Sequence, residues 1–196
     1  MKRKETFATT GPRMTVRFFA GYDFSEADLK AGLAETGYAR GVPMGAALKA
    51  DDKNRKPRFL IAAMRDPEGA NLDRVQIIKG WLDAAGETHE RVYDIAWSGD
   101  RKPDARGRLP AVESTLDMGS ASYSNALGAP ELATWWQDPD FDPGQATFYY
   151  IRVLEIPTPR WTEYDAAYFR ITPPEGTSMI VQERAYSSPI WYKAKG

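Results

Sequence analysis

The segment Thr147–Ile156 (T-F-Y-Y-I-R-V-L-E-I) constrains the fold more than any other part of the sequence. Nearly all of its residues are β-branched, aromatic or aliphatic, which is the composition of a strand in a packed sheet. Successive side chains of a strand point to opposite faces, so the odd-numbered residues share one face and the even-numbered residues the other. Because both faces are largely apolar, we predict a central strand covered on both sides. Pro157 and Pro159 then end the strand, since proline has no N–H to donate.

The fold class that follows is mainly β. The pattern Tyr149-x-Ile151-x-Val153 resembles strand F of immunoglobulin-like sandwiches, in which a tyrosine precedes two inward residues. We therefore predict an immunoglobulin-like β-sandwich with one or two peripheral short helices, and we expect Ile151 and Val153 to be fully buried. Its 196 residues are expected to form one domain. Residues 1–57 would hold an entry segment, a first strand, a short helix and a covering loop, and residues 58–196 the main sandwich.

Period-two alternation and turn residues mark the other expected strands. They are Met14–Phe19, Arg58–Arg65, the hairpin Asp73–Asp83 with Glu90–Ser98, an edge strand within Val112–Tyr123, Leu132–Gln137, and a last strand Ser178–Ala185.

Two short helices are expected. The first runs from Glu26 to Glu35 and ends near Gly37. Ser25 and Asp28 have the spacing of a capping box, and Phe24 is placed to contact Leu29. The second lies within Trp161–Ile171, with Thr162 as its N-cap.

Composition excludes several classes of protein. The formal net charge of −1 provides no basic field for nucleic acid, and no apolar run is long enough for a membrane helix. The first ten residues have no apolar segment, so we predict no signal peptide in this chain, and composition leaves the compartment open. The absence of cysteine and the single histidine, His89, exclude thiolate sites and sites built from several imidazoles.

No catalytic group, cofactor site or metal site is predicted. Asp138, Asp140 and Asp142 have the spacing that begins an EF-hand loop, but the sixth position is Pro143 and the twelfth is Tyr149. Repeated Asp-Pro is ordinary turn chemistry, so a turn is favoured over a calcium site. His89 follows a hairpin turn among polar residues and is expected to be a bystander, which leaves the serines without a base.

The candidate ligand-binding or docking residues are aromatic side chains and arginines. Trp135 and Trp136 are adjacent on an expected strand and must face opposite ways. With Trp161, Tyr164, Tyr168 and Trp191 they can form a stacking platform for sugars or a docking surface, or else belong to the core and its rim. Arg13 and Arg160, like Arg17 and Arg40, can bind a phosphate or carboxylate, although nothing in the sequence brings them together.

Several long strings resemble the C-terminal part of the bacterial DUF3604 family. They include RKETFATTGPRMTVRFF at 3–19, DPEGANLDRVQIIKGW at 66–81, VYDIAWSGD at 92–100, FYYIRVLEIPTPRW at 148–161 and QERAYSSPIWY at 182–192. That family resembles the PHP superfamily of metal-dependent phosphoesterases. The resemblance implies a PHP-like domain upstream that holds the metal ligands, and it allows a periplasmic or extracellular location. After G-V-P-M-G the family pattern continues with glycine and an acidic residue, but Ala46 and Ala47 stand here.

Two hypotheses for function follow. In the first, the chain is a non-catalytic accessory domain that packs on, or completes, a PHP-like metallohydrolase domain. An exposed apolar patch is then expected near Phe7 and Phe19, with one of Trp135 and Trp136. In the second, it is a free-standing module that binds a carbohydrate-type ligand through exposed aromatic residues. The substrate and the oligomeric state are left open.

Overall fold

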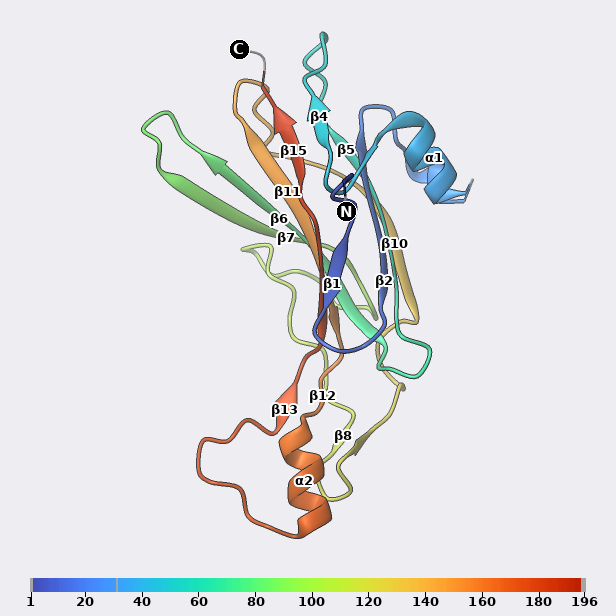
Figure 1. The fold of residues 1–196 in the computed structure, drawn as a ribbon, viewed down its shortest axis with the longest axis vertical. Helices are drawn as coiled ribbons and strands as arrows, with labels where there is room; N and C mark the ends of the chain where they lie inside the picture. Colours follow the sequence, from blue (N-terminus) through green and yellow to red (C-terminus); the bar gives the residue numbers. More distant parts are fainter. Residues whose placement is uncertain (1, 31, 195–196) are drawn as a thin grey trace.

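The computed structural model describes residues 2–30 and 32–194 and shows a β-sandwich (Figure 1). Strands make up 40% of the chain and helices 11%, which confirms the mainly β class. A seven-stranded sheet faces a four-stranded sheet, and two small two-stranded sheets lie beyond them.

The large sheet is built around β11 (Thr147–Glu155), the strand that the sequence marked most strongly. On one side β11 pairs along its length with β6 (Leu72–Leu82), which pairs in turn with β7 (Thr88–Trp97). On the other side two strands share the edge of β11, and each pairs with a short outer strand. These are β14 (Arg184–Ser187) with β1 (Phe7–Thr9), and β15 (Ile190–Lys193) with β4 (Ala47–Lys49).

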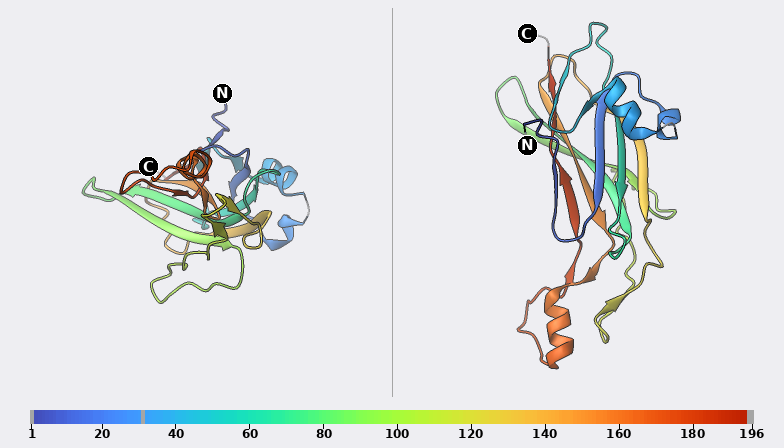
Figure 2. Two further views of the ribbon diagram at one scale, coloured as in Figure 1. Left: turned by 90° about the horizontal axis from the view of Figure 1, so that it is seen from below. Right: turned by 45° about the vertical axis from the view of Figure 1, so that its right-hand side comes forward.

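The small sheet has the order β10 (Glu131–Gln137), β5 (Arg58–Met64), β2 (Thr15–Gly21) and β3 (Val42–Pro43). The 3-10 helix η1 (Glu26–Leu29) and the helix α1 (Leu33–Arg40) lie beside this sheet (Figure 2). Leu29 and Leu33 pack there against Phe19, Phe24 and Leu60, away from the main core. The helices therefore cover the outer face of the small sheet.

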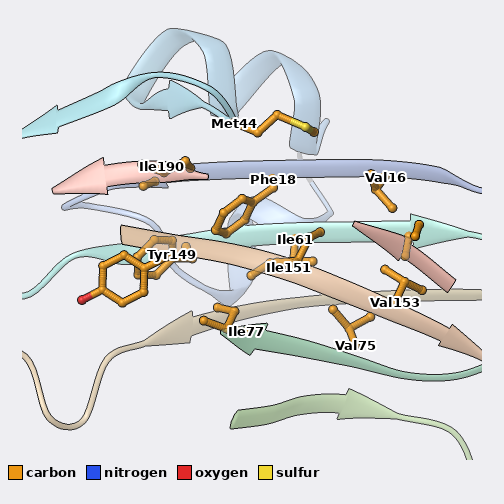
Figure 3. Packing of buried hydrophobic residues seen from close by; sticks show 14 of the residues in the cluster. Val16, Phe18, Met44, Ile61, Val75, Ile77, Tyr149, Ile151, Val153 and Ile190 are labelled. Carbon is orange, nitrogen blue, oxygen red and sulfur yellow. The ribbon is translucent and has the colours of Figure 1, made fainter. Parts of the chain in front are cut away.

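The main core lies between the two sheets (Figure 3). Ile151 and Val153 are both 0% exposed, as predicted, and they pack with side chains such as Phe18 and Ile61 from the small sheet. Along β11 buried residues alternate with half-buried ones. The central position of the strand is confirmed. Its second face is only half-buried, however, because no helix of the described residues covers that side of the large sheet.

The first 57 residues contribute to both sheets. β1 and β4 pair with strands of the large sheet, and β2 and β3 belong to the small one. Residues 1–57 were expected to enter and cover the sandwich. They instead contribute strands to both sheets, together with residues 58–196.

A separate arm projects beyond one end of the sheets (Figures 1 and 2). It consists of residues 157–183, which we call the α2 arm. The arm contains β12 (Thr158–Pro159), α2 (Trp161–Phe169) and β13 (Ile180–Val181). β12 contacts β9 of the small hairpin formed by β8 (Leu116–Asp117) and β9 (Ser122–Tyr123).

The helix predicted over Glu26–Glu35 is wrong in its bounds. The capping box of Ser25 and Asp28 is present, but it begins the short η1 only. Gly32, with a φ of 83°, separates η1 from α1, and a left-handed backbone there cannot continue a helix. Gly37 then lies inside α1, where an added Cβ would come within 2.5 Å of the Phe19 ring, so glycine allows the close packing. Residue 31 lies outside the described part.

Three other local predictions need correction. Val112–Tyr123 forms only the short strands β8 and β9 instead of an edge strand, because its Ser and Thr side chains bond to nearby backbone and to each other. Ser178–Ala185 is divided between β13 and β14, and β15 was missed. The N-cap of α2 is Arg160, because the Thr162 hydroxyl instead donates to the carbonyl oxygen of Ser178 at 2.6 Å.

Within the described residues, the helices are too short or too polar to cross a membrane.

Candidate functional site

An apolar groove opens where the β6–β7 hairpin leaves the large sheet. Its volume is about 890 Å³. The aromatic members of its lining are Trp81, His89, Phe148, Trp191 and Tyr192. We call it the aromatic groove. A concave, largely apolar site with a few polar groups is the usual form of a small-molecule site.

Gly80 on β6 shapes this groove. It lies opposite Phe148 on β11, and an added Cβ would come within 2.2 Å of the Phe148 ring. The ring therefore lies directly over the backbone of β6. Trp191 packs against the other side of Phe148, with ring centroids 5.2 Å apart, and remains 49% exposed. The groove thus presents an aromatic surface to solvent.

His89 lies on the wall of the groove. Its ring stacks on that of Trp81 with centroids 5.4 Å apart, and its Nε2 lies 2.8 Å from Asp83 Oδ2. The sequence indicated a solvated histidine, and the side chain is 43% exposed. Its partner, Trp81, could not be identified from sequence because the two residues meet only through the register of β6 and β7.

A row of aromatic rings continues from the groove across the outer face of the large sheet. Phe148 is followed by Tyr150, with centroids 6.3 Å apart, and Tyr150 by Tyr186 at 6.5 Å. These three side chains are half-buried. Together with Trp191 they form what we call the aromatic row, which crosses from β15 through β11 to β14.

Trp135 and Trp136 face opposite ways, as predicted. Trp136 packs into the main core, where its ring lies 5.6 Å from that of Phe59. Trp135 packs on the other side of β10 against the cluster under the helices, with Arg58 over its ring at 5.7 Å. Both are half-buried, and neither joins the aromatic groove or the α2 arm. The sequence left two alternatives for this pair, a binding surface or the core and its rim. In the structure the two tryptophans belong to the core and its rim.

Trp161 and Arg160 lie together on the α2 arm. Trp161 is 63% exposed, and the Arg160 guanidinium lies over its ring at 6.0 Å. The helix that follows exposes Tyr164, Tyr168 and Phe169 as well. The six aromatic residues predicted as a possible platform are therefore split. Three are on the arm, Trp191 is at the groove, and Trp135 and Trp136 are in the packed sheets.

Arg13 takes part in a structural ion pair. Its Nε and Nη2 donate to the two carboxylate oxygens of Asp66 at 3.2 and 3.3 Å, and Nη2 also reaches Glu68. The Arg13 guanidinium and backbone N–H lower the pKa of Asp66 to about 2. This pairing ties the start of β2 to the turn after β5, and it balances the charge of Arg13 with two carboxylates.

The expected apolar patch near Phe7 and Phe19 is wrong for Phe19. Phe19 is 1% exposed because α1 covers it, and only Phe7, at 38%, faces solvent. Six of the thirteen exposed large hydrophobic side chains lie on the α2 arm instead. They are Trp161, Tyr164, Tyr168, Phe169, Ile171 and Ile180.

The buried charges near the aspartate turn were not predicted. Lys79 on β6 donates to Asp138 Oδ2 at 2.6 Å and to the Asp140 carbonyl at 2.7 Å, and both charged side chains are almost fully buried. Tyr149 donates to the same Asp138 oxygen at 2.7 Å. Burial and the nearby Asp138 charge raise the pKa of the Tyr149 phenol. Asp138 thus anchors the turn to the core.

The other two aspartates of the turn have local partners. Asp140 accepts from the Tyr93 hydroxyl at 2.8 Å and pairs with Arg91, and Asp142 accepts from the Gly144 N–H at 2.8 Å. Over residues 2–30 and 32–194, no group of three or more His, Cys, Asp and Glu side chains is arranged to hold a metal ion. The two Asp-Pro repeats form turns at residues 139–140 and 143–144.

Glu155 at the end of β11 is a buried carboxyl group that forms no ion pair in the described part of the chain. It is 2% exposed, and its Oε1 atom has no hydrogen-bond partner among the residues that the structure describes. Burial, followed by the charges of Glu183 and Asp66, raises the pKa of Glu155 to about 7. The sequence did not indicate the raised pKa of Glu155, because the residue lies in an otherwise largely apolar strand.

Comparison with known proteins identifies a family without a described activity. The family model "Protein of unknown function (DUF3604)" matches residues 1–194. No curated protein and no solved structure matches the chain. The match covers essentially the whole sequence and includes the strings that suggested the family, so this chain belongs to the DUF3604 family.

Proposed function

We propose that this chain is a non-catalytic β-sandwich module that docks through its α2 arm onto a PHP-like metal-dependent hydrolase domain. The observation that carries the proposal is the exposure of the arm's aromatic residues. Trp161, Tyr168 and Phe169 are 63, 81 and 62% exposed. Contiguous exposed apolar surface of this kind marks interaction sites more often than it marks ordinary protein surface.

The arm has the composition of an interface centre. Exposed tryptophan, tyrosine and arginine side chains contribute most to binding in measured interfaces, and Trp161, Tyr168 and Arg160 supply all three types. The arm also projects away from the sandwich, where a partner can reach it without disturbing either sheet (Figure 1).

The partner is inferred from the family. DUF3604 proteins resemble PHP-type hydrolases, whose chemistry needs clustered metal ions held by several histidines and carboxylates. This chain contains one histidine and no cysteine, so the partner domain, fused or separate, would supply that cluster. An immunoglobulin-like strand arrangement, a bacterial source and a periplasmic or extracellular location belong to the same proposal.

Replacing Trp161 and Tyr168 together with serine is expected to weaken binding to the PHP-like domain of a DUF3604 protein by roughly 10-fold or more, because two central aromatic anchors are lost. Calorimetry with the separately produced PHP-like domain measures the affinity. Both residues are exposed, so the melting temperature is expected to change little.

The matched control is Leu82→Ser at the far tip of the hairpin, where another large apolar side chain is 56% exposed. This variant is expected to bind like the wild type. Equal affinity for all three proteins, or no binding by the wild type, would contradict the docking proposal.

The second candidate function is binding of a carbohydrate-type ligand. The aromatic groove favours it, because Phe148 and the half-exposed Trp191 present ring faces to solvent beside a cavity of about 890 Å³. Sugar rings stack on aromatic faces of this kind, and polar groups at the rim such as Thr88, Glu90 and Lys193 can accept or donate hydrogen bonds.

Trp191→Ala is expected to reduce binding of any oligosaccharide that the wild type binds by roughly 10-fold, since a stacked aromatic ring contributes about 1–2 kcal/mol. An oligosaccharide array followed by fluorescence titration provides the measurement. Trp161→Ala, which removes the exposed tryptophan of the α2 arm, is the control and should bind like the wild type. A Trp191→Ala protein with unchanged affinity would exclude this groove.

A further inference from the structure

Three arginines lie on the outer face of the large sheet, where β6, β11 and β14 are neighbours. In the register of the strands, Leu154 lies between Arg74 and Arg184, and the next outward residue of β11, Arg152, lies between Gln76 and Tyr186. Apart from Tyr186, these side chains line a second groove of about 450 Å³, which also contains Gln182. We call it the arginine groove. Residues from strands far apart in sequence thus bring three arginines to one groove, beside apolar side chains such as Leu109 and Leu154.

Only one of the three arginines is neutralised. Arg74 pairs with Asp73 at 2.9 Å and Asp94 at 3.5 Å, and Arg101 also pairs with Asp73 at 2.6 Å. Two carboxylates therefore balance Arg74 and Arg101. Among the described residues, no carboxylate forms an ion pair with Arg152 or Arg184, so two positive charges remain at the groove.

Hydrogen bonds at Nε orient both of these arginines. Arg152 Nε donates to Gln76 Oε1 at 2.8 Å, and Gln76 is held in turn by Asp94 at 2.8 Å. Arg184 Nε donates to the carbonyl oxygen of Gln182 at 3.3 Å. These hydrogen bonds fix the orientation of each guanidinium group. They leave its two terminal nitrogens to donate to another acceptor.

Tyr186 lies opposite Arg152 of β11 and two residues beyond Arg184 on β14. Arg184, and to a lesser extent Arg152, lower the pKa of the Tyr186 phenol, against the opposing effect of its partial burial. Apart from that phenol, the described residues offer the terminal nitrogens of Arg152 and Arg184 no acceptor. An arginine that is half-buried yet lacks an anionic partner is suited to bind an anion from outside, since guanidinium groups hold carboxylate and phosphate oxygens in pairs.

We propose that Arg152 and Arg184, with the neighbouring Tyr186, form a binding site for the oxyanion of an acidic oligosaccharide, either a carboxylate or a phosphate. The identity of the sugar part rests on the carbohydrate-binding function proposed for the aromatic groove. The aromatic row supports it, because Tyr150 and Phe148 lead from Tyr186 to Trp191 on the same face. Phe148 and Arg152 are four residues apart on one strand, roughly 13 Å, which favours a ligand of more than one sugar ring.

Titrations with two sugars and one simple ion test the proposal. Trigalacturonate carries the carboxylates, its methyl ester lacks the charge, and inorganic phosphate carries an oxyanion without a sugar. We expect the wild type to bind trigalacturonate roughly 10-fold or more tightly than the ester, because a hydrogen bond to a charged group is stronger than one to a neutral group. Phosphate is expected to shift the Nε–H resonances of Arg152 and Arg184.

Three variants test whether the preference for the acid over the ester depends on Arg152. Arg152→Gln should remove the preference for the acid over the ester, and Arg152→Lys, which keeps the charge without the planar guanidinium group, should be intermediate. Arg17→Gln, which removes an exposed charge from β2 on the other sheet, should behave like the wild type. A melting temperature near that of the wild type shows that each variant is folded.

The outcomes separate the two proposals. Equal affinity for acid and ester, with a loss only in Trp191→Ala, would overturn the oxyanion site and leave the groove as a neutral sugar site. A phosphate shift that Arg152→Gln abolishes, without binding of either sugar, would support the oxyanion site and reject carbohydrate as the ligand. If phosphate causes no shift and the acid is not preferred, the oxyanion site is wrong.

Discussion

Val153→Asp is expected to abolish cooperative folding. Val153 is 0% exposed at the centre of β11, between the paired strands β6 and β14 and against the small sheet. The valine contributes about 1.5–3 kcal/mol by leaving water, and an unpaired carboxylate in its place costs considerably more. Together these losses approach the whole stability of a domain, which is about 5–15 kcal/mol. Thermal and urea unfolding followed by circular dichroism measure the result.

Val92→Asp is the matched control for this substitution. Val92 is a valine on β7 of the same sheet, but it is 42% exposed, so the new carboxylate stays in water. The control should keep a cooperative transition. A Val153→Asp protein that melts within a few degrees of the wild type would show that β11 is not the centre of the core.

Asp138→Ala is expected to lower the free energy of unfolding by about 3–5 kcal/mol, because it leaves a buried ammonium without its counter-ion. Lys79 is 2% exposed and would retain only the Asp140 carbonyl and the face of Trp81 as partners. Tyr149 would lose the acceptor of its hydroxyl as well. Guanidinium chloride unfolding gives the difference between variant and wild type.

A double variant distinguishes the loss of the Lys79–Asp138 ion pair from a general disruption of the core. Lys79→Met combined with Asp138→Ala removes both charges and is expected to be more stable than Asp138→Ala alone, since no unpaired charge is left. The exposed pair of Arg108 and Asp104 provides the comparison, and Asp104→Ala there should change stability little. If the double variant is as unstable as the sum of its single variants, Lys79 and Asp138 do not act as a pair.

The sequence alone determined the class of fold and the strands of seven residues or more. Side chains alternate between the two faces of a strand with period two. The alternation in Thr147–Ile156 and in the hairpin arms is therefore a local signal that does not depend on which strands they pair with. The same holds for the capping box at Ser25 and for the turn at Asp138, which depend on residues within a few positions. Helix bounds were less predictable, because the backbone at Gly32 and the packing of Gly37 on Phe19 depend on the sheet below.

The tertiary structure decided which candidate side chains meet. Trp135, Trp161 and Trp191 look alike in sequence, but packing half-buries the first beside η1, places the second on a projecting arm and leaves the third over a groove. The buried pair of Lys79 and Asp138 joins residues 59 positions apart. Arg152 and Arg184 meet through the register of β11 and β14. Sequence patterns describe one element at a time, whereas these sites arise from the pairing of strands that are distant in sequence. The register of that pairing is set by burial of the core face of each sheet.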